Sequence, residues 1–347
     1  MLAAVYHGIQ DIRVEEVEGP AIGPDEALLR VRAATICGTD LRIYTSGHFK
    51  IPPGTRRILG HEVAGEVAAV GQAVKALKPG QRIAIAPNIG CGTCWQCIQG
   101  HNHMCPDYEA FGISLDGAFA QYMRIPAPFI QRGNIAFIPE SLSYEEAALN
   151  EPFSCCYNGS RACRIEPGDV VLIIGAGPIG IMHLFLARLS GASLVIVSEM
   201  IEERLAQAME FGADLVVNPA RDDVAEVVQK ASGGRGADVV IVAAPSPAAQ
   251  EQALELVATQ GRINFFGGLP TGKEFIRFNS NLVHYKGIIV TGTTGSSSFQ
   301  FRRSMEILAS GRVKLAPLVS ARFPLTQIKE AFDLAASKKI LKVVVEP

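Results

Sequence analysis

The chain has 347 residues, of which 48% are hydrophobic and 19% are charged, and its formal net charge is −2. This composition excludes disordered and fibrous proteins, and the charge gives no electrostatic reason to expect a nucleic acid or a membrane surface as a partner. The length favours two domains, or one large one.

The first 150 residues are predicted to be rich in β-structure. Short apolar segments, such as residues 26–32 and 63–70, are separated by glycine and proline. The N-terminal residues have neither the basic region nor the apolar region of a signal peptide, so we expect a cytoplasmic protein.

Three separate fragments of this half carry side chains that could bind a metal ion. Cys37 is followed by Thr39, His61 is followed by Glu62, and Glu151 stands near the end of the half. A catalytic zinc ion needs three protein ligands and one open position. Cys37, His61 and one carboxylate would supply such a set.

Four cysteines lie within fifteen residues, at Cys91, Cys94, Cys97 and Cys105. Four thiolates complete the tetrahedral shell of a structural zinc ion, which then has no position left for chemistry. An iron–sulfur cluster is the alternative, but the ferredoxin pattern has a shorter last gap and needs a second cysteine set. A zinc knuckle for nucleic acid would carry basic residues, and no Lys or Arg lies between Cys91 and Cys105. We predict a zinc-bound loop in a reducing compartment.

From about residue 169 the chain alternates between strands and helices, which is typical of a parallel, doubly wound sheet. The expected strands are 170–174, 194–197, 215–217, 239–243, 262–266 and 288–290, and the expected helices are 179–189, 202–211, 224–231 and 248–258. A helix at 301–310 and a strand at 342–345 follow. This tail does not continue the alternation, so we expect it to pack on the first domain.

The segment Gly175-Ala176-Gly177-Pro178-Ile179-Gly180 follows the first of these strands and opens a helix. This is the dinucleotide-binding pattern, in which the glycines permit a tight turn and a close approach of the pyrophosphate. Glu199, at the end of the second strand, could accept both ribose hydroxyls and would repel a 2′-phosphate, so NAD is preferred over NADP. Arg204 could flank the adenine, although its place at a helix start favours a surface ion pair.

With these motifs, the chain resembles the zinc-dependent medium-chain dehydrogenases, in the branch of sorbitol (L-iditol) and threonine dehydrogenases. The most specific motif is Gly60-His61-Glu62-x2-Gly65-x5-Gly71-x2-Val74. The resemblance implies an α/β protein with a GroES-like, β-rich catalytic domain at 1–153 and a zinc lobe at about 88–107. It also implies a Rossmann NAD-binding domain at 154–295, a segment at 296–347 that returns to the catalytic domain, two zinc ions per chain, and a homotetramer or dimer.

The resemblance further implies roles for single residues. Cys37 and His61 resemble catalytic zinc ligands, and Glu62 and Glu151 resemble alternate ligands or close neighbours of the metal. Thr39 would hydrogen-bond the substrate oxygen, and Asp40 would orient His61. Zinc lowers the pKa of a substrate hydroxyl and a hydride passes to NAD+, which gives a ketone.

The substrate is less defined, because the chain departs from the named relatives. Arg42 replaces a histidine that often completes the proton relay, and Asn88 replaces a histidine typical of threonine dehydrogenases. We expect a polyol or sugar-like secondary alcohol, with threonine-like amino alcohols as the alternative. A zinc-free quinone or enone reductase is a further alternative that the cysteines disfavour. The expected cleft residues are mostly polar: Tyr44, His48, Arg57, Phe111 and Glu151.

Overall fold

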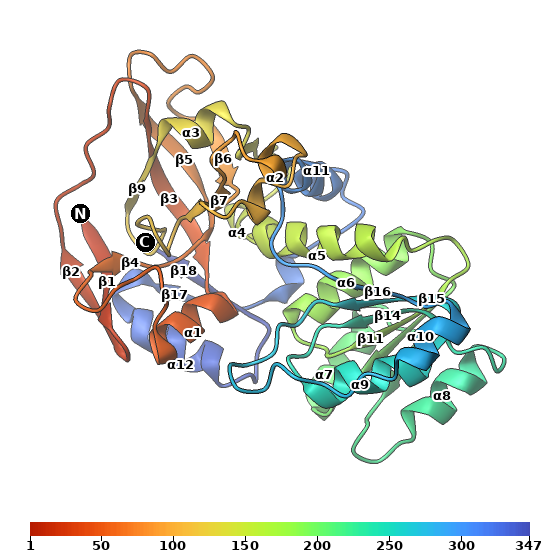
Figure 1. Ribbon diagram of the computed structural model, residues 1–347. Coiled ribbons are helices and arrows are strands. Elements are labelled where there is room, and N and C mark those ends of the chain that lie inside the picture. Colours follow the sequence, from red (N-terminus) through yellow and green to blue (C-terminus); the bar gives the residue numbers. More distant parts are fainter. The chain divides into compact units, whose positions relative to one another are not determined.

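The structure is a computed structural model that describes all residues from Met1 to Pro347. The chain forms two compact units. The first consists of Met1–Ser154 together with Ser296–Pro347, and the second is Cys155–Gly295. In Figure 1 the violet-blue end of the chain, from Ser296 onward, therefore belongs with the red and orange elements, whereas the blue helix α10 belongs to the second unit.

The first unit is built on β-sheets. A seven-stranded sheet has the order β10-β6-β5-β3-β18-β17, with β9 also paired to β3, and a smaller sheet has the order β2-β1-β4. The strands are β1 (Leu2–Gly8), β2 (Asp11–Glu16), β3 (Ala27–Thr35), β4 (Arg57–Ile58), β5 (Glu62–Val70), β6 (Arg82–Ile85), β7 (Asn88–Ile89), β8 (Glu109–Ala110), β9 (Tyr122–Ile125), β10 (Ile135–Phe137), β17 (Val319–Pro324) and β18 (Lys342–Glu346). The helices are α1 (Gly38–Ser46), α2 (Trp95–Ile98), α3 (Ala127–Gln131), α4 (Tyr144–Ala148), α11 (Ser298–Ala309) and α12 (Ile328–Ala336).

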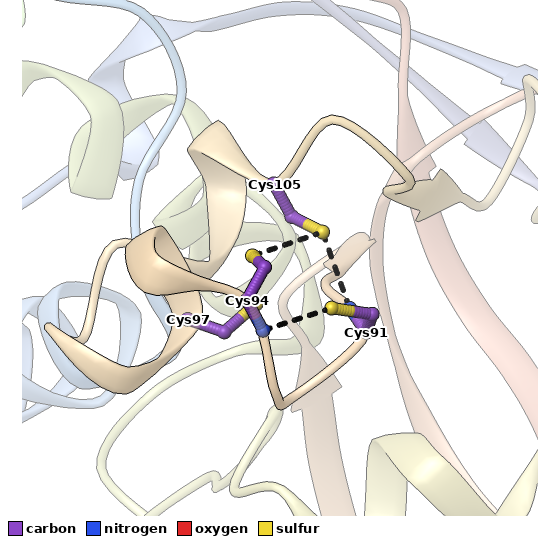
Figure 2. Close-up of side chains that lie close together, drawn as sticks. All are labelled: Cys91, Cys94, Cys97 and Cys105. Carbon is purple, nitrogen blue, oxygen red and sulfur yellow. Dashed lines mark hydrogen bonds between the residues drawn. The ribbon is translucent and has the colours of Figure 1, made fainter.

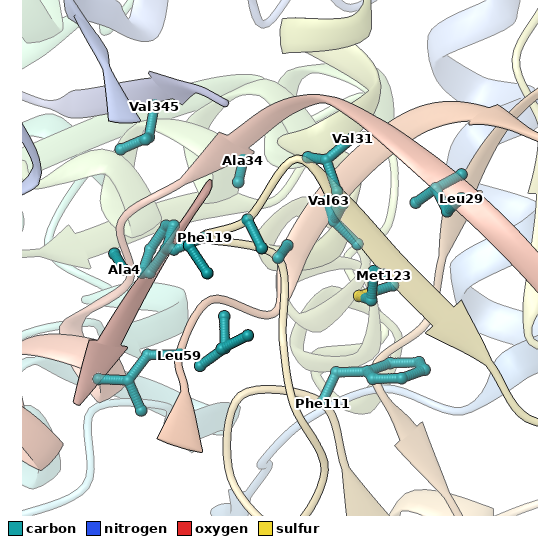
Figure 3. Packing of buried hydrophobic residues seen from close by; sticks show 14 of the residues in the cluster. Ala4, Leu29, Val31, Ala34, Leu59, Val63, Phe111, Phe119, Met123 and Val345 are labelled. Atoms are coloured by element: carbon teal, nitrogen blue, oxygen red, sulfur yellow. The ribbon is translucent and has the colours of Figure 1, made fainter. Parts of the chain in front are cut away.

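The core of this unit follows from the two-residue period of its strands. In β3, Leu29 and Val31 are buried while Arg30 and Arg32 are exposed, as expected for a strand with one face on the core. Figure 3 shows Leu29 and Val31 among the buried side chains of this core. β3 and β5 pair so closely that a Cβ on Gly65 would overlap the Arg30 carbonyl, which explains this glycine of the motif.

The second unit holds a six-stranded parallel sheet of order β13-β12-β11-β14-β15-β16, and this confirms the predicted doubly wound sheet. The strands are β11 (Val170–Ile174), β12 (Leu194–Ser198), β13 (Leu215–Val217), β14 (Ala237–Val242), β15 (Val257–Phe265) and β16 (Ile289–Gly292). The helices are α6 (Pro178–Leu189), α7 (Glu202–Glu210), α8 (Val224–Ala231), α9 (Pro247–Leu256) and α10 (Ser280–Lys286), and α5 (Asn150–Cys163) enters from the first unit. All five residues of β11 are buried, because helices cover both faces of such sheets.

Several elements differ from the sequence-based expectations. The cysteine-rich segment is not only a loop, because it contains the short helix α2 and a 3-10 turn at Asn102–Met104. Helices α5, α10 and α12 and strand β17 were not predicted. Pro152 of α5 lies in the first turn, where a proline costs no hydrogen bond, so it does not interrupt the helix. No helix is both long enough and apolar enough to cross a membrane.

Candidate active site

The first predicted metal ligand, Cys37, caps the N-terminus of α1. Its backbone N–H donates a 2.9 Å hydrogen bond to Oδ2 of Asp40, the third residue of the helix. Asp40 is completely buried, and its Oδ1 accepts a 3.2 Å hydrogen bond from the N–H of Gly60. One carboxylate therefore fixes the segment that carries Cys37 and the segment that carries the next ligand.

That next ligand is His61, which directly precedes β5. Its Nδ1 lies 3.4 Å from Oδ1 of Asp40, so the carboxylate faces this nitrogen and leaves Nε2 for a metal ion. The arrangement matches the predicted orienting role of Asp40. Burial alone would lower the pKa of His61, but the charges of Asp40 and Cys37 outweigh burial and raise it well above 6.5. A pocket that favours a proton on His61 favours a cation in general.

Glu62, the first residue of β5, is fully buried, and only one of its two carboxylate oxygens accepts hydrogen bonds. Its Oε2 accepts hydrogen bonds from Oγ1 of Thr35, its cross-strand partner, and from Nζ of Lys342. Lys342 also donates to the carbonyl of Ile36 at 3.1 Å. Oε1 of Glu62 is buried and has no hydrogen-bond partner, which suits an oxygen that can turn toward a metal ion.

Sequence reasoning missed both Thr35 and Lys342. Lys342 lies on the last strand, β18, which pairs with β3 at Val344 and Thr35. Burial lowers the pKa of Lys342, whereas the charges of Glu62, Cys37 and Glu151 raise it, and the net direction is upward. The only signal in the sequence was a lysine at the start of an apolar strand, and that pattern more often marks an exposed residue.

Cys37, His61 and Glu62 form one group whose ligand atoms all lie within 4.8 Å of one another. A thiolate, an imidazole and a carboxylate are the donors that zinc binds in catalytic sites. The orphaned Oε1 of Glu62 and the raised pKa of His61 both indicate that a cation belongs there. The residues therefore fit a zinc ion.

The other residues predicted for this site lie outside that group. Thr39 is half-buried in the first turn of α1. Glu151 is buried in the first turn of α5 and is close enough to raise the pKa of Lys342, but it is not one of the three grouped ligands. Phe111, which we expected to line a cleft, is 1% exposed and packs against Phe129 in the core, and it also borders a cavity of about 430 Å³ together with Arg57.

The four-cysteine group is brought together as the spacing predicts, and Figure 2 shows the four side chains converging. The Sγ atoms of Cys94 and Cys105 are 3.7 Å apart. This separation is too long for a disulfide, and it matches the edge of about 3.8 Å of a tetrahedron whose zinc–sulfur bonds are about 2.3 Å. The N–H groups of Thr93 and Cys94 lower the pKa of the Cys91 thiol to about 6, which favours the thiolate. These residues fit a structural zinc ion.

The predicted nucleotide motif forms the turn between β11 and α6. Gly175 has a φ of 106°, and a Cβ on Gly180 would overlap the Gly175 carbonyl oxygen. A Cβ on Gly177 would meet only Arg204, at 3.7 Å, so the space outside Gly177 is open to a ligand. Pro178 and Ile179 begin the helix, whose N-terminus carries the partial positive charge that binds phosphates.

Glu199, which follows β12, contacts this turn through its side chain. Its carboxylate accepts hydrogen bonds from the N–H groups of Ala176 at 3.0 Å and Met200 at 2.7 Å. Nη1 of Arg204 lies 3.8 Å from Oε2 of Glu199, and the Arg204 side chain is 14% exposed. The expected ion pair of Arg204 is therefore present, with Glu199 as its partner. It does not lie on the surface, because this arginine is partly buried beside the nucleotide turn.

Comparison with known families gives two matches along the chain. Residues 23–132 match the family described as the alcohol dehydrogenase GroES-like domain. Residues 178–310 match the family described as zinc-binding dehydrogenase.

Individual proteins match over nearly the full length. Sorbitol dehydrogenase of Bacillus subtilis is 37% identical, over 100% of this chain and 97% of the relative. L-threonine 3-dehydrogenase of Pyrococcus horikoshii is also 37% identical, over 95% of this chain and 93% of the relative. Among solved structures, a protein from Sinorhizobium meliloti described as a zinc-binding dehydrogenase and bound to NADP has a TM-score of 0.92 and 33% identity, covering 100% of this chain and 99% of that one.

Proposed function

Because this chain belongs to the zinc-binding dehydrogenase family and is an NAD-dependent zinc alcohol dehydrogenase, we propose that it oxidises a secondary alcohol of a polyol or sugar-like substrate to a ketone. One observation supports the proposal most directly: the half-buried Cys37 and the buried His61 and Glu62 form one ligand group. The same chain also has a glycine-rich dinucleotide turn.

The protein's part in the reaction is to hold and orient the reacting groups. Zinc, when bound, supplies a Lewis acid that lowers the pKa of the substrate hydroxyl. Cys37 and His61 would hold it, and Asp40 keeps both in place through the Cys37 N–H and Nδ1 of His61. When bound, NAD+ would supply the hydride acceptor, and Gly177 with the N-terminus of α6 would hold its pyrophosphate.

The substrate proton needs an acceptor on the protein. Thr39 follows Cys37 by two residues and offers a hydroxyl that can accept one proton and donate another. Arg42 cannot continue this relay, because a guanidinium does not deprotonate near neutral pH. Burial, together with the charges of Lys50 and Arg42, lowers the pKa of His48, which makes this imidazole a weaker proton acceptor than an exposed histidine.

Glu151 completes the proposed set of acidic residues. It lies buried in the first turn of α5, where a carboxylate is also favoured by the helix dipole. We assign it the role of a carboxylate that tunes the charge of the metal site, together with Glu62. We assign direct ligation of the metal to Glu62 rather than to Glu151, because Glu62 belongs to the group with Cys37 and His61.

For the nucleotide, Glu199 supports NAD over NADP. Its carboxylate sits at the turn beside Ala176, where it would oppose the negative charge of a 2′-phosphate. Arg204 could partly compensate that charge at 3.8 Å from Glu199. The Sinorhizobium meliloti structure holds NADP, and initial rates with NAD+ and NADP+ test the preference for NAD in this chain.

A polyol also fits the site better than threonine. Threonine carries a carboxylate and an ammonium group, and both need charged partners when they leave water. The buried cation of the site, Lys342, is already neutralised by Glu62. Position 88, where threonine dehydrogenases typically have a histidine, holds the neutral Asn88.

The experiment is a substrate panel with the zinc-loaded protein. NAD+ reduction is followed with sorbitol, L-iditol, xylitol and L-threonine, each over a range of concentrations. We expect kcat/KM for at least one polyol to be at least about tenfold above that for L-threonine, equivalent to about 1.4 kcal/mol of transition-state binding. Faster turnover of L-threonine than of every polyol would move the assignment to the amino-alcohol class.

A further inference from the structure

The four-cysteine loop, residues 91–105, is connected to the first turn of α5 by hydrogen bonds that pass through α11. We propose that Asn102 of this loop is a positioning residue for the catalytic metal site, because it fixes α11 and thereby the carboxylate of Glu151. The structural zinc site then influences the chemistry without taking part in it. The inference rests on the role proposed for Glu151. All residues of the connection belong to the first unit.

Asn102 is held in place by the four-cysteine loop itself. It lies in the 3-10 turn between Cys97 and Cys105, and its carbonyl accepts a 3.3 Å hydrogen bond from the N–H of Cys105. Its side-chain Nδ2 donates to the carbonyl of Asn88 at 3.3 Å. A Cβ on Gly90 would overlap the Asn102 carbonyl oxygen, so the backbone is closely packed here. A zinc ion bound by the four thiolates therefore fixes the position of Asn102.

The side-chain oxygen of Asn102 is bonded to α11. Its Oδ1 accepts a 3.1 Å hydrogen bond from the N–H of Ser298, the first residue of that helix, although the two residues are 196 positions apart in sequence. The first N–H groups of a helix have no partner within the helix, and they form the positive end of the helix dipole. Figure 1 shows the four-cysteine loop, with α2, next to α11. The bond therefore fixes the N-terminus of α11 to the loop.

A buried polar cluster connects α11 to the first turn of α5. Oδ1 of Asn150 accepts a 2.8 Å hydrogen bond from Oγ of Ser304, and Nδ2 of Asn150 donates to the carbonyl of Phe301 at 2.9 Å. A displacement of either helix would break these bonds and leave polar groups unsatisfied away from water, which is costly. The N-terminal part of α11 and the start of α5 therefore hold each other in a fixed position. The cluster consists of Asn150, Ser154, Ser296 and Ser304, each at most 4% exposed.

The last hydrogen bonds connect Ser296 to the residue that carries the carboxylate. Oγ of Ser154 donates to the carbonyl of Glu151 at 2.6 Å. A hydroxyl has only one proton, so Ser296 is the donor in the 2.6 Å contact between the Oγ atoms of Ser154 and Ser296. Glu151 is buried, and its charge acts on Lys342, the cation that holds Glu62. The segment after Gly295 therefore fixes the backbone of Glu151 and, with it, the place of the carboxylate near the metal ligands.

The test is the release of the catalytic zinc ion to excess dipicolinate, with the zinc that remains on the chain measured by mass spectrometry at successive times. The release phase that is missing in Cys37→Ser belongs to the catalytic ion. Asn102→Ala should speed this phase at least about threefold, because a displaced Glu151 no longer offsets the charge of the metal. Asn102→Asp keeps an oxygen for the Ser298 N–H and should restore the wild-type rate within about twofold. The exposed His101→Ala, in the same loop, is the matched control and should have no effect.

Two further variants show whether the effect passes through α11 and Glu151. Ser154→Ala breaks the same connection at its other end, so it should reproduce the faster catalytic release and leave the structural zinc unaffected. This variant also covers the case that Asn102→Ala disturbs the four-cysteine loop. Glu151→Gln should speed the release at least about tenfold. Adding Asn102→Ala to Glu151→Gln should then change the rate less than about twofold, because the position of an uncharged side chain matters little to the metal.

A wild-type rate of catalytic zinc release in Asn102→Ala or in Ser154→Ala would overturn the proposal. A failure of Asn102→Asp to restore the rate would also overturn it, as would effects that multiply in the double variant, since Asn102 would then not act through Glu151. An unchanged rate in Glu151→Gln would refute the role proposed for Glu151 and the inference with it. A failure of the polyol assignment would leave all of these rates as they are, because no alcohol is present in the experiment.

Discussion

Lys342 is the residue that connects the end of the chain with the metal site. It lies on β18, is 5% exposed, and holds Glu62 from a position 280 residues away in sequence. A buried carboxylate without its cation is strongly destabilising, whereas removal of both charges is much less so. The fixed oxygen of Glu62 also decides which oxygen remains free for zinc.

This pairing leads to a prediction for a double-mutant cycle. Lys342→Met should lower the free energy of unfolding by about 3–5 kcal/mol, because it leaves Glu62 charged and buried. The double variant Lys342→Met with Glu62→Gln should lose about 1–3 kcal/mol less than the sum of the single losses. Urea unfolding of the zinc-loaded proteins measures each value, and strictly additive losses would contradict the pairing.

His183 of α6 is a second buried residue, and it should affect how the free energy of unfolding depends on pH. It is completely buried, neither ring nitrogen has a hydrogen-bond partner, and burial lowers its pKa to about 3. The unfolded chain, with a pKa of about 6.5, therefore binds a proton that the folded chain does not. Between about pH 6 and pH 3 this difference should lower stability, by up to about 1.4 kcal/mol for each pH unit of acidification.

The corresponding variant is His183→Leu, with the exposed His284→Leu as its control. His183→Leu should flatten the decline of the unfolding free energy between about pH 6 and pH 4, and His284→Leu should not. Denaturant unfolding at several pH values measures the slopes. An unchanged slope in His183→Leu would show that His183 is not held neutral in the folded chain.

Glu199 is the residue from which we predict the preference for NAD+ over NADP+. Its carboxylate lies beside the turn, with oxygens that accept from Ala176 and Met200. We expect kcat/KM with NAD+ to exceed that with NADP+ by at least about tenfold, and Glu199→Gln to reduce this ratio. Initial rates with both cofactors measure it. A wild-type enzyme that uses NADP+ equally well would indicate that Arg204 determines the choice.

At the scale of elements, two glycines of the turn from β11 to α6 have different roles, one in stability and one in cofactor binding. A Cβ on Gly180 would overlap the Gly175 carbonyl, so Gly180→Ala should destabilise the second unit by several kcal/mol. A Cβ on Gly177 has open space, so Gly177→Ala should fold normally. It should nevertheless weaken NADH binding at least about tenfold, because the pyrophosphate approaches this backbone.

Thermal unfolding and NADH fluorescence titration measure the two properties independently. Normal NADH affinity in Gly177→Ala would show that the pyrophosphate does not pass over this residue. Normal stability in Gly180→Ala would contradict the close approach of helix and strand.

The same elements show what the sequence could predict. Strands β11 to β14 and helices α6 to α9 were predicted within two residues at every end, because apolar runs alternate with glycine and proline signals there. β17 was not predicted, because it depends on parallel pairing with β18, from Val319 with Lys342 onward, which no local pattern encodes. The same reason hides Lys342 and Thr35, whose roles depend on strands that are distant in sequence.

At the scale of the whole molecule, the predicted resemblance, the fold class and the two zinc sites are confirmed by the family matches and the two ligand groups. These conclusions follow from short motifs of fixed spacing, which can be recognised in the sequence without knowledge of the tertiary structure. The cytoplasmic location, the homotetramer or dimer, and the polyol specificity stay predictions, because each depends on surfaces or side chains that no motif specifies.

The most direct test of the account is the zinc content per chain, measured by mass spectrometry together with NAD+ reduction. Wild-type protein should hold two zinc ions, and Cys37→Ser and Cys97→Ser should each hold one, in line with the two ligand groups. Only Cys37→Ser should lose turnover entirely while keeping its fold, because the four-cysteine site has no open position for substrate. Two zinc ions in Cys37→Ser, or undiminished turnover without the Cys37 thiolate, would contradict the assignment of the chemistry to Cys37, His61 and Glu62.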